Sequence, residues 1–196
     1  SSGVTVNGFT VTNSLQAGIR VGSPEGDGYI ENTRILNNYI RGNGVGIVFQ
    51  GGVYYYGECE GSCGYDYYPD RFVNTIIDSN RIELNNAVIP YSEDVSVRPS
   101  GGLNGLSAGN HGIVFAGDTE NTLISRNLIT DNNGHGILIA GSSNEYSLQH
   151  TNMAIVVNRI VRPGEVGIQV GGEYFYNTLD DYYYGSGYAG EGGRVS

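Results

Sequence analysis

Residues 32–49 read NTRILNNYIRGNGVGIVF, and the phrase inside them recurs along the chain. The phrase is I-x-x-N-x-I, followed a few residues later by Gly-Ile and a further apolar residue. Four copies share it, and they begin at Ile35, Ile77, Ile124 and Ile155. A variant copy begins at Val6 and has Phe9 in place of the asparagine. Self-similarity of this kind indicates a solenoid, in which each copy is one structural repeat.

Each copy contains short apolar runs of period two, separated by Gly, Asn and Asp, which is typical of strands joined by turns. Ile, Val, Phe and Tyr dominate the apolar positions, as they do in strands. Stacking the equivalent strands predicts an all-β fold, a single parallel β-helix of about five coils with strands about 4.8 Å apart. In the second copy the side chains expected to fill the lumen are Ile35, Ile40, Ile47 and Phe49.

The asparagine of the phrase occupies the same position within the coil, which we call its phase, in four copies. A side-chain amide can bond to the equivalent amides above and below it, and so satisfy polar groups that are costly to bury. Asparagine also suits turns in general, so four unconnected turn residues are the alternative. The identical phase favours an internal ladder with a structural role, made of Asn38, Asn80, Asn127 and Asn158.

The copies start 29, 42, 47 and 31 residues apart, counted from Val6 through Ile155. A bare coil needs roughly two dozen residues, so the excess predicts loops that leave the solenoid. Two large insertions are expected at about 52–72 and 87–109, and shorter ones near 23–31 and 142–151. The coils then span about 3–171 of a single domain of residues 1–196, and a Tyr- and Gly-rich tail follows at 172–196.

The chain of 196 residues carries 20 acidic and 10 basic side chains, a formal net charge of −10. This charge argues against nucleic acid as a partner, because too few cations are present to neutralise phosphates. No apolar run reaches the length of a membrane span. Lysine is absent, so no lysine can act as a base or form a Schiff base. The chain opens inside a coil, which suggests a processed form or a piece of a longer protein.

Tyrosine is unusually frequent, with 16 residues and no tryptophan. Tyrosine combines a broad apolar surface with a polar tip, which suits sugar stacking and recognition. The alternative is that these rings cover the flank of the solenoid, where Val48, Val114 and Leu138 should face outward as an apolar stripe that needs a cover. Packing on the flank is the favoured interpretation. The ligand-binding candidates in the first insertion are Tyr54, Tyr55, Tyr56, Tyr65, Tyr67 and Tyr68.

Both cysteines, Cys59 and Cys63, lie in the first large insertion. A small-ring disulfide would staple this loop and would place the protein in an oxidising compartment, secreted or at the cell surface. A zinc site would need four ligands, and no second pair lies nearby in sequence. Four acids of the same loop could hold Ca²⁺, but their spacing matches no recognised calcium loop, so no cofactor is expected. They are Glu58, Glu60, Asp66 and Asp70.

Two histidines, His111 and His135, occupy the same phase of adjacent copies. Their imidazoles should therefore stack about 5 Å apart. With Asp118 or Asp131 as a neighbour, such a pair could bind a metal ion or act as an acid and base. The alternative, which is favoured, is a corner position that accepts His as readily as the Val of the neighbouring copies.

The residues Asn32-Thr-x-Ile35-x-x-Asn38-x-Ile40, repeated from Asn121 to Ile129, resemble the right-handed parallel β-helix repeats of the pectate-lyase-like superfamily. The resemblance covers most of residues 3–171 and implies a right-handed coil. The superfamily includes polysaccharide lyases, hydrolases and epimerases, phage tailspikes and non-catalytic surface proteins, so the fold alone does not set the activity.

The catalytic patterns of that superfamily are incomplete in this chain. Its lyases use Arg or Lys beside a Ca²⁺ held by several acids. Here Arg81 and Arg159 share one phase with Glu83 nearby, but no coil presents three acids. Enzymatic activity is therefore left open, with a polysaccharide lyase as the type to expect. The favoured hypothesis is a structural or assembly module that self-associates through open coil ends or the Tyr-rich tail. The alternative is a protein that binds or modifies a polysaccharide.

Overall fold

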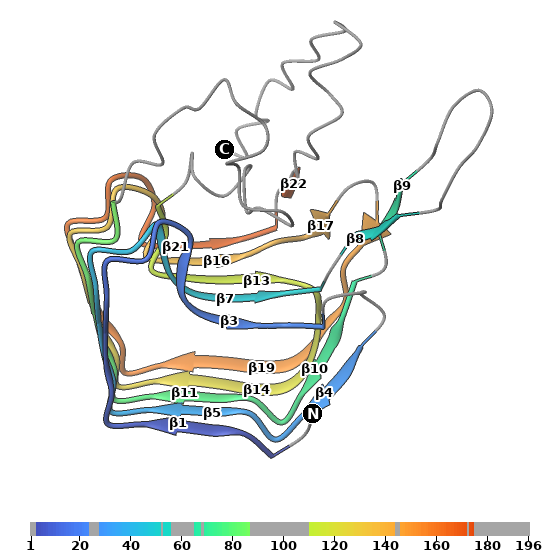
Figure 1. Cartoon of the computed structure of the whole chain (residues 1–196), viewed down its shortest axis with the longest axis horizontal. Helices are drawn as coiled ribbons and strands as arrows, with labels where there is room; N and C mark the ends of the chain where they lie inside the picture. Colours follow the sequence, from blue (N-terminus) through green and yellow to red (C-terminus); the bar gives the residue numbers. More distant parts are fainter. Residues whose placement is uncertain are drawn as a thin grey trace, which may run out of the picture.

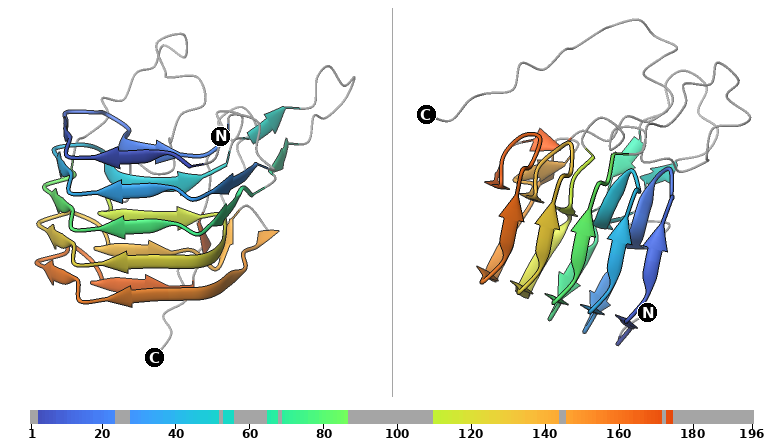
Figure 2. Two further views of the ribbon diagram at one scale, coloured as in Figure 1. Left: turned by 90° about the horizontal axis from the view of Figure 1, so that it is seen from below. Right: turned by 90° about the vertical axis from the view of Figure 1, so that its left-hand side faces the viewer.

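The structure is a computed structural model that describes residues 3–23, 28–51, 53–55, 65–67, 69–86, 110–143, 146–171 and 173–174. The chain winds into five stacked coils whose strands form three parallel sheets (Figures 1 and 2). The prediction of an all-β parallel β-helix is confirmed. Among the described residues there is no helix that could cross a membrane.

The first sheet lies along the lower side of the solenoid in Figure 1 and pairs strands of all five coils in parallel. Its main stack is β1 (Thr5–Asn7), β5 (Arg34–Leu36), β11 (Ile76–Asp78), β14 (Asp118–Ser125) and β19 (His150–Val156). Two short strands, β4 (Tyr29–Glu31) and β10 (Arg71–Val73), extend it on the N-terminal side of the long strand β14.

The other two sheets each contain one strand from every coil. The second sheet stacks β2 (Thr10–Thr12), β6 (Tyr39–Arg41), β12 (Arg81–Glu83), β15 (Leu128–Thr130) and β20 (Arg159–Val161). The third sheet stacks β3 (Ala17–Val21), β7 (Val45–Gln50), β13 (Ile113–Ala116), β16 (Ile137–Ile139) and β21 (Ile168–Val170). We number the coils 1 to 5 by their third-sheet strands, from β3 to β21.

Small strands form where the chain leaves the coils. In the first large insertion, β8 (Val53–Tyr55) pairs antiparallel with β9 (Tyr65–Tyr67). After coil 4, β17 (Ser142–Ser143) pairs antiparallel with β18 (Tyr146–Ser147) and parallel with β22 (Glu173–Tyr174). These excursions lie at the same end of the third sheet (Figure 1).

The lumen is a column of isoleucine and phenylalanine. Ile35, Ile40 and Ile47 are fully buried, as are their counterparts in coils 3 and 4. The ring of Phe49 stacks on that of Phe115, with centroids 4.3 Å apart, and Phe72 meets Phe49 edge-on at 5.2 Å. Side chains of equal size at equal phase thus fill the space between successive coils, which is the main apolar contribution to stability.

The coils turn at residues with left-handed backbone. In coil 2 these are Asn32, Asn37 and Gly42, with φ of 56°, 53° and 67°. Glycine and asparagine adopt this conformation most readily, which explains their frequency between the strands. Equivalent corners of other coils hold Leu84 and Val157, with φ of 52° and 57°. The sequence pattern therefore marks some of the corners, and the stacking of the coils imposes the others.

The insertions are shorter than the sequence predicts. Coil 3 already resumes at β10, and Phe72, placed by the sequence at the end of the first large insertion, is a fully buried lumen residue. Likewise β4 and the start of β19 belong to the first sheet rather than to loops. The difference arises because each long coil uses an additional strand that the recurring phrase does not contain.

The outward-facing apolar stripe on the third sheet is buried. Val48 and Val114 are fully buried and Leu138 nearly so, in a second apolar cluster that also includes Leu148. In the end coils the same row continues as the polar residues Arg20 and Gln169. The burial of this stripe agrees with the expectation that it needs a cover. Because the equivalent residues of coils 1 and 5 are polar, the buried part of the stripe is confined to coils 2, 3 and 4.

Replacement of Thr122 by valine is expected to stabilise the protein. The Thr122 hydroxyl is buried and has no hydrogen-bond partner, and its counterpart in coil 5 is the apolar Met153. Removing an unsatisfied buried hydroxyl at nearly constant volume should raise the free energy of unfolding by about 1 kcal/mol. Thermal melts should then shift upward by roughly 3 °C. The control Thr130→Val removes a hydroxyl bonded to Asp131 and should give no gain; equal gains for both variants would contradict this explanation.

Candidate functional site

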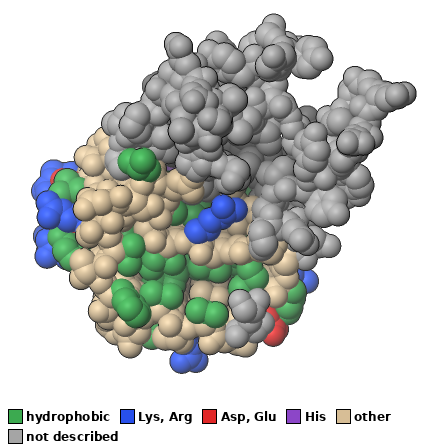
Figure 3. Space-filling view, viewed as in Figure 1, with side chains coloured by type: hydrophobic (Ala, Val, Ile, Leu, Met, Phe, Trp, Pro, Cys, Tyr) green, Lys and Arg blue, Asp and Glu red, His purple; other side chains and the backbone are tan. Residues whose placement is uncertain are grey.

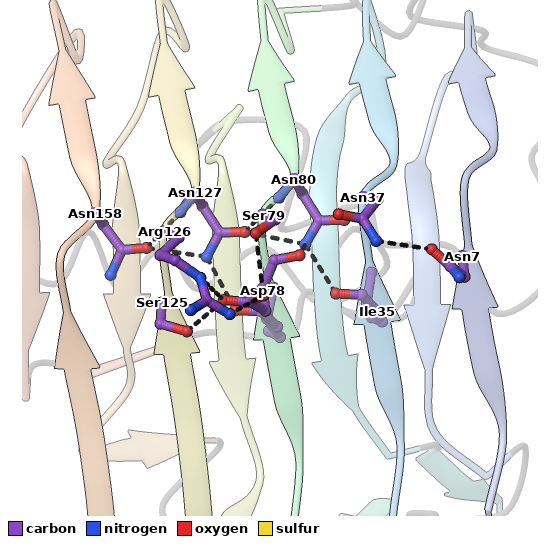
Figure 4. Close-up of polar contacts among 11 residues, drawn as sticks. Asn7, Ile35, Asn37, Asp78, Ser79, Asn80, Ser125, Arg126, Asn127 and Asn158 are labelled. Atoms are coloured by element: carbon purple, nitrogen blue, oxygen red, sulfur yellow. Dashed lines mark hydrogen bonds and ion pairs between the residues drawn. The ribbon is translucent and has the colours of Figure 1, made fainter.

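The four asparagines of the recurring phrase form a row along the solenoid, buried at Asn38, Asn80 and Asn127 and partly buried at Asn158. Figure 4 shows the part of this row from Asn80 to Asn158. The side-chain oxygen of Asn80 accepts hydrogen bonds from the backbone and side-chain nitrogens of Asn38, at 2.9 and 3.0 Å. The amide of Asn80 in turn donates to Asn127 and to the carbonyl of Ile35. The same pattern repeats at Asn158. Each amide thus satisfies backbone groups of the coil before it, which is a structural role.

A second asparagine ladder was not predicted from the sequence. Asn43, Asn85 and Asn132 are buried. The side-chain oxygens of Asn85 and Asn132 each accept two bonds from the coil before, at 2.9 to 3.1 Å. The side-chain oxygen of Asn43 accepts one bond, from the backbone of Ser14. The signal was available, because each of these asparagines follows the second isoleucine of its copy by three residues. In coil 5 the position is Pro163, where the ladder ends.

The histidine pair lies at one corner of the third sheet. The rings of His111 and His135 are parallel within 8° and their centroids are 4.9 Å apart, close to the spacing expected from the sequence. The backbone nitrogen of His135 donates to Nδ1 of His111, and that of Val166 donates to Nδ1 of His135. Each imidazole therefore accepts a bond from the next coil, whereas the asparagine oxygens accept bonds from the coil before them.

The carboxylate beside this pair is Glu165, whose Oε2 lies 3.0 Å from Nε2 of His135. The aspartates that the sequence suggested lie elsewhere. Asp131 pairs with Arg162 through two bonds of 2.6 and 2.7 Å, which lowers the pKa of its carboxyl. Asp118 accepts a bond from the backbone of Gln149. Neither aspartate forms an ion pair with His111 or His135 among the described residues.

Acidification is expected to destabilise the protein through His111. Burial, with the neighbouring His135, lowers the pKa of His111 from 6.5 to about 3. Below pH 6.5 the unfolded chain binds a proton that the folded chain does not, so stability falls as the pH falls. The loss should be about 1.4 kcal/mol per pH unit, or about 2 kcal/mol between pH 6.5 and 5.

Urea unfolding at pH 7.5 and pH 5 measures this effect. His111→Val removes the titrating group and keeps the residue type found at this phase in coils 2 and 5. The variant should lose most of the pH dependence of the wild type above pH 5, although its stability at pH 7.5 is lower. An unchanged slope in the variant would show that another group is responsible.

Arg81 belongs to a polar cluster on the outer face of the second sheet. Glu83, only 8% exposed in its side chain, accepts bonds from Tyr39 at 2.5 Å and from Arg81 at 2.7 Å, and Arg41 lies 3.7 Å away. The Arg81 guanidinium also lies over the Tyr39 ring, 5.2 Å from its centroid. Burial raises the pKa of Glu83, but the bonds from Tyr39 and Arg81 outweigh it and the net pKa is lowered. An ionised, fully bonded carboxylate is suited to holding Arg81 in place rather than to donating a proton.

Asp70, one of the four proposed calcium ligands, has a structural role in the described part of the chain. It is fully buried, and its two oxygens accept bonds from the backbone and hydroxyl of Ser23 and the backbone of Gly28, at 2.5 to 2.9 Å. Such a cradle of donors satisfies a carboxylate without a metal ion. Within the described ranges, no group of three or more His, Cys, Asp or Glu residues could hold a metal ion.

Most other candidates of the first insertion lie outside the described residues. These are Tyr56, Glu58, Cys59, Glu60, Cys63 and Tyr68, so the proposed disulfide stays a prediction. The backbone of Tyr54, Tyr55, Tyr65, Asp66 and Tyr67 belongs to the β8–β9 pair, with Tyr54 opposite Asp66. This pairing places the backbones of the two tyrosine groups of the loop side by side.

The first coil leaves its apolar side uncovered. Phe9 and Leu15 are 60% and 50% exposed, and the lumen residues Val11 and Ile19 are only partly buried. Figure 3 looks onto this coil and shows hydrophobic side chains gathered at the centre of the face. The strands β1, β2 and β3 are also the edge strands of their sheets. Uncovered edges of this kind invite pairing with another chain.

Comparison with known families places the chain among right-handed β-helix proteins. The model of the right handed beta helix region matches residues 1–182, which is most of the chain, and the chain belongs to this family. Comparisons with curated proteins and with solved structures gave no match. The family membership agrees with the parallel stacking of the three sheets and gives the coil its right-handed sense.

Proposed function

We propose that the chain is a structural and assembly module that works outside the cell or at its surface and associates with further copies of itself through coil ends. The uncovered face of coil 1 supports this proposal most directly. It combines three edge strands with exposed Phe9 and Leu15 and with the half-buried side chains of the lumen. A patch of contiguous exposed apolar residues, rimmed by polar ones, is typical of an interaction site.

Sedimentation of the full chain over a range of concentrations tests the proposal. The wild type should associate as concentration rises, whereas the double variant Phe9→Asp/Leu15→Asp should remain a monomer with an unchanged melting temperature. Val157→Asp is the matched control, because Val157 is 81% exposed and belongs to coil 5, at the other end of the stack. A wild type that stays monomeric, or a double variant that associates equally well, would reject the proposal.

A second candidate function is the binding or modification of an acidic polysaccharide. The outer face of the second sheet favours it, because Arg159 makes no side-chain bond within the described residues and shares a row with Leu128 and Arg81. Guanidinium groups recognise carboxylates through paired hydrogen bonds. The proposed tyrosines of the first insertion would add stacking surfaces for sugar rings.

Incubation with pectate and alginate separates the two functions. Binding that is weakened by Arg159→Ala, or the appearance of unsaturated products, supports the carbohydrate function. The control Arg126→Ala removes an arginine already paired with Asp78 at 2.6 Å, and should leave binding unchanged. Absence of both binding and products would remove this candidate.

A further inference from the structure

A glycine precedes the first lumen isoleucine of the third sheet in every coil. In coils 1 to 4 a methyl group added to this glycine would lie 2.4 to 2.9 Å from a carbonyl oxygen of the following coil, so glycine is required there. These four residues are Gly18, Gly46, Gly112 and Gly136. In coil 5 the residue is Gly167, and the atom nearest to an added methyl group is 3.9 Å away. Coil 5 thus keeps the space for the carbonyl of a further coil, although no described coil follows it.

The same edge of coil 5 has unpaired donors. The backbone nitrogens of Gly136 and Ile137 donate to the carbonyls of Val166 and Gly167 in coil 5, at 3.0 and 2.9 Å. Because β21 is the last strand of its sheet, the corresponding nitrogens of Gly167 and Ile168 have no acceptor within the described residues. Such an edge is a template for pairing with another chain.

The lumen is also open at this end of the stack, which is the end opposite to coil 1 (Figure 2). Ile168 and Val170 are 44% and 72% exposed. Their counterparts in coil 4, Ile137 and Ile139, are buried by coil 5 itself. The far face of coil 5 therefore lacks apolar cover as well as hydrogen-bond partners.

Coil 1 has the dimensions of a coil that could follow coil 5. Its successive lumen residues are 5, 8 and 2 residues apart, at Val6, Val11, Ile19 and Val21. The same intervals separate the lumen residues of coil 5, which are Ile155, Ile160, Ile168 and Val170. In coil 2 the second interval is 7, because the corner before the third sheet is one residue shorter. Coil 1 therefore matches coil 5 better than it matches its own neighbour.

Coil 1 of a second copy, placed on coil 5 in this register, would meet apolar residues throughout the lumen. The charged residues of the two coils would all meet uncharged ones. Arg20 would lie against Gln169, Arg159 against Thr10, Arg162 against Asn13, and Glu165 against Gln16. The contact thus buries apolar side chains without bringing like charges together.

The two asparagine ladders differ at this contact. In each ladder an asparagine oxygen accepts a bond from a backbone nitrogen of the coil before it. At the second ladder coil 5 has Pro163, which has no N–H group to satisfy, so Ser14 of coil 1 suffices there. At the first ladder Asn158 has an N–H group, and coil 1 presents Phe9, which cannot accept it. The contact between copies therefore has one bond fewer than a contact within the chain, and is the weaker of the two.

We propose that the far face of coil 5 docks onto coil 1 of a second copy, so that the stack of coils continues from one molecule to the next. This inference rests on the proposed function and names the surface that the face of coil 1 recognises. The carbonyl of Gly18 in the second copy takes the space beside Gly167 and accepts a bond from the backbone nitrogen of Ile168. Two different faces in contact build an open filament where the rotation does not close. Each copy adds about 24 Å to its length, since five coils lie about 4.8 Å apart.

Sedimentation of the full chain carrying Gly167→Ala tests the docking. The added methyl group should leave the melting temperature of the monomer unchanged, because it lies 3.9 Å from the nearest atom, but it would collide with the incoming carbonyl. The dissociation constant should rise about tenfold or more. Val170→Asp, which places a carboxylate on the same face, should act in the same direction.

Val157→Asp is again the matched control and should associate as the wild type does. Val157 lies at an outer corner of coil 5, with a left-handed backbone. Its counterparts Asn37 and Arg126 bond to the coil before them, away from the face that would meet a second copy.

Mixing two blocked variants identifies the surface that meets coil 1. Gly167→Ala keeps an intact coil 1 face, and Phe9→Asp/Leu15→Asp keeps an intact coil 5 face. At concentrations where the wild type assembles, each variant alone should stay monomeric, whereas an equal mixture should form a dimer that grows no further. Electron microscopy of the wild type should show filaments with a subunit repeat of about 24 Å.

The outcomes separate this inference from the proposed function. If Gly167→Ala associates as the wild type does, or if the mixture gives no dimer, the docking is overturned while the proposed function stands. A wild type that forms only a closed dimer would also overturn it, since that would pair the face of coil 1 with itself. A wild type that stays monomeric at every concentration would reject both.

Discussion

Gly112→Ala is expected to destabilise the protein by about 3 kcal/mol, which is at the upper end of the usual cost of overpacking. A methyl group added at this position would lie 2.5 Å from the carbonyl oxygen of Gly136 and 2.7 Å from Cγ2 of Ile129. The carbonyl belongs to the backbone of the next coil and cannot rotate away. Coils 3 and 4 must therefore move apart at this position, and the lumen loses contact between them. Urea unfolding monitored by circular dichroism measures the loss.

The matched control is Gly167→Ala. Gly167 holds the same phase in coil 5, but there the nearest atom to an added methyl group is 3.9 Å away. This variant should stay within about 0.5 kcal/mol of the wild type. Similar losses for the two alanines would mean that the close approach between coils is not what requires glycine at this phase.

Asn80→Ala is expected to cost about 3 kcal/mol, because it leaves buried polar groups of two coils without partners. The backbone and side-chain nitrogens of Asn38 lose their acceptor, and the carbonyl of Ile35 and the oxygen of Asn127 each lose a donor. Each unsatisfied buried group costs about 1–3 kcal/mol, and small local adjustments recover part of the total. Chemical unfolding at neutral pH gives the value.

Asn74→Gly provides the comparison for this variant. Asn74 also bonds to asparagines of the neighbouring coils, but on the exposed corner row. Glycine keeps its left-handed backbone, with φ of 54° in the wild type, so only exposed bonds are lost. The loss should stay below about 1 kcal/mol. If Asn80→Ala lowers the free energy of unfolding by no more than Asn74→Gly does, then burial does not strengthen the contribution of the internal ladder to stability.

The arrangement of the lumen could be predicted because it depends on phase alone. Ile35, Ile77 and Ile124 recur with the same neighbours, and a period-two strand places such residues on one face. The stacked pair His111 and His135 followed from the same reasoning, and the structure gives its centroid separation as 4.9 Å. Equal phase in a solenoid is therefore a reliable indication of contact.

The partners of the candidate residues could not be predicted in this way. Asp131 turned out to lie against Arg162, and Glu165, which the sequence analysis did not consider, lies beside His135. Both residues are in corners, where the direction of the side chain depends on the local backbone turn. Asp70 is one of several loop acids in the sequence, yet in the structure it is buried against Ser23 and Gly28, from a distant part of the chain.

The sequence by itself determined the coil, because repeated apolar residues at fixed positions of each copy have only one way to share a core, and Gly and Asn between them favour the left-handed corners. Only the tertiary structure decided where the coil resumes after each insertion, which carboxylate meets which cation, and that both end coils leave apolar residues uncovered. These features depend on contacts between residues with no common period. Such contacts are fixed by the packing of one coil on the next.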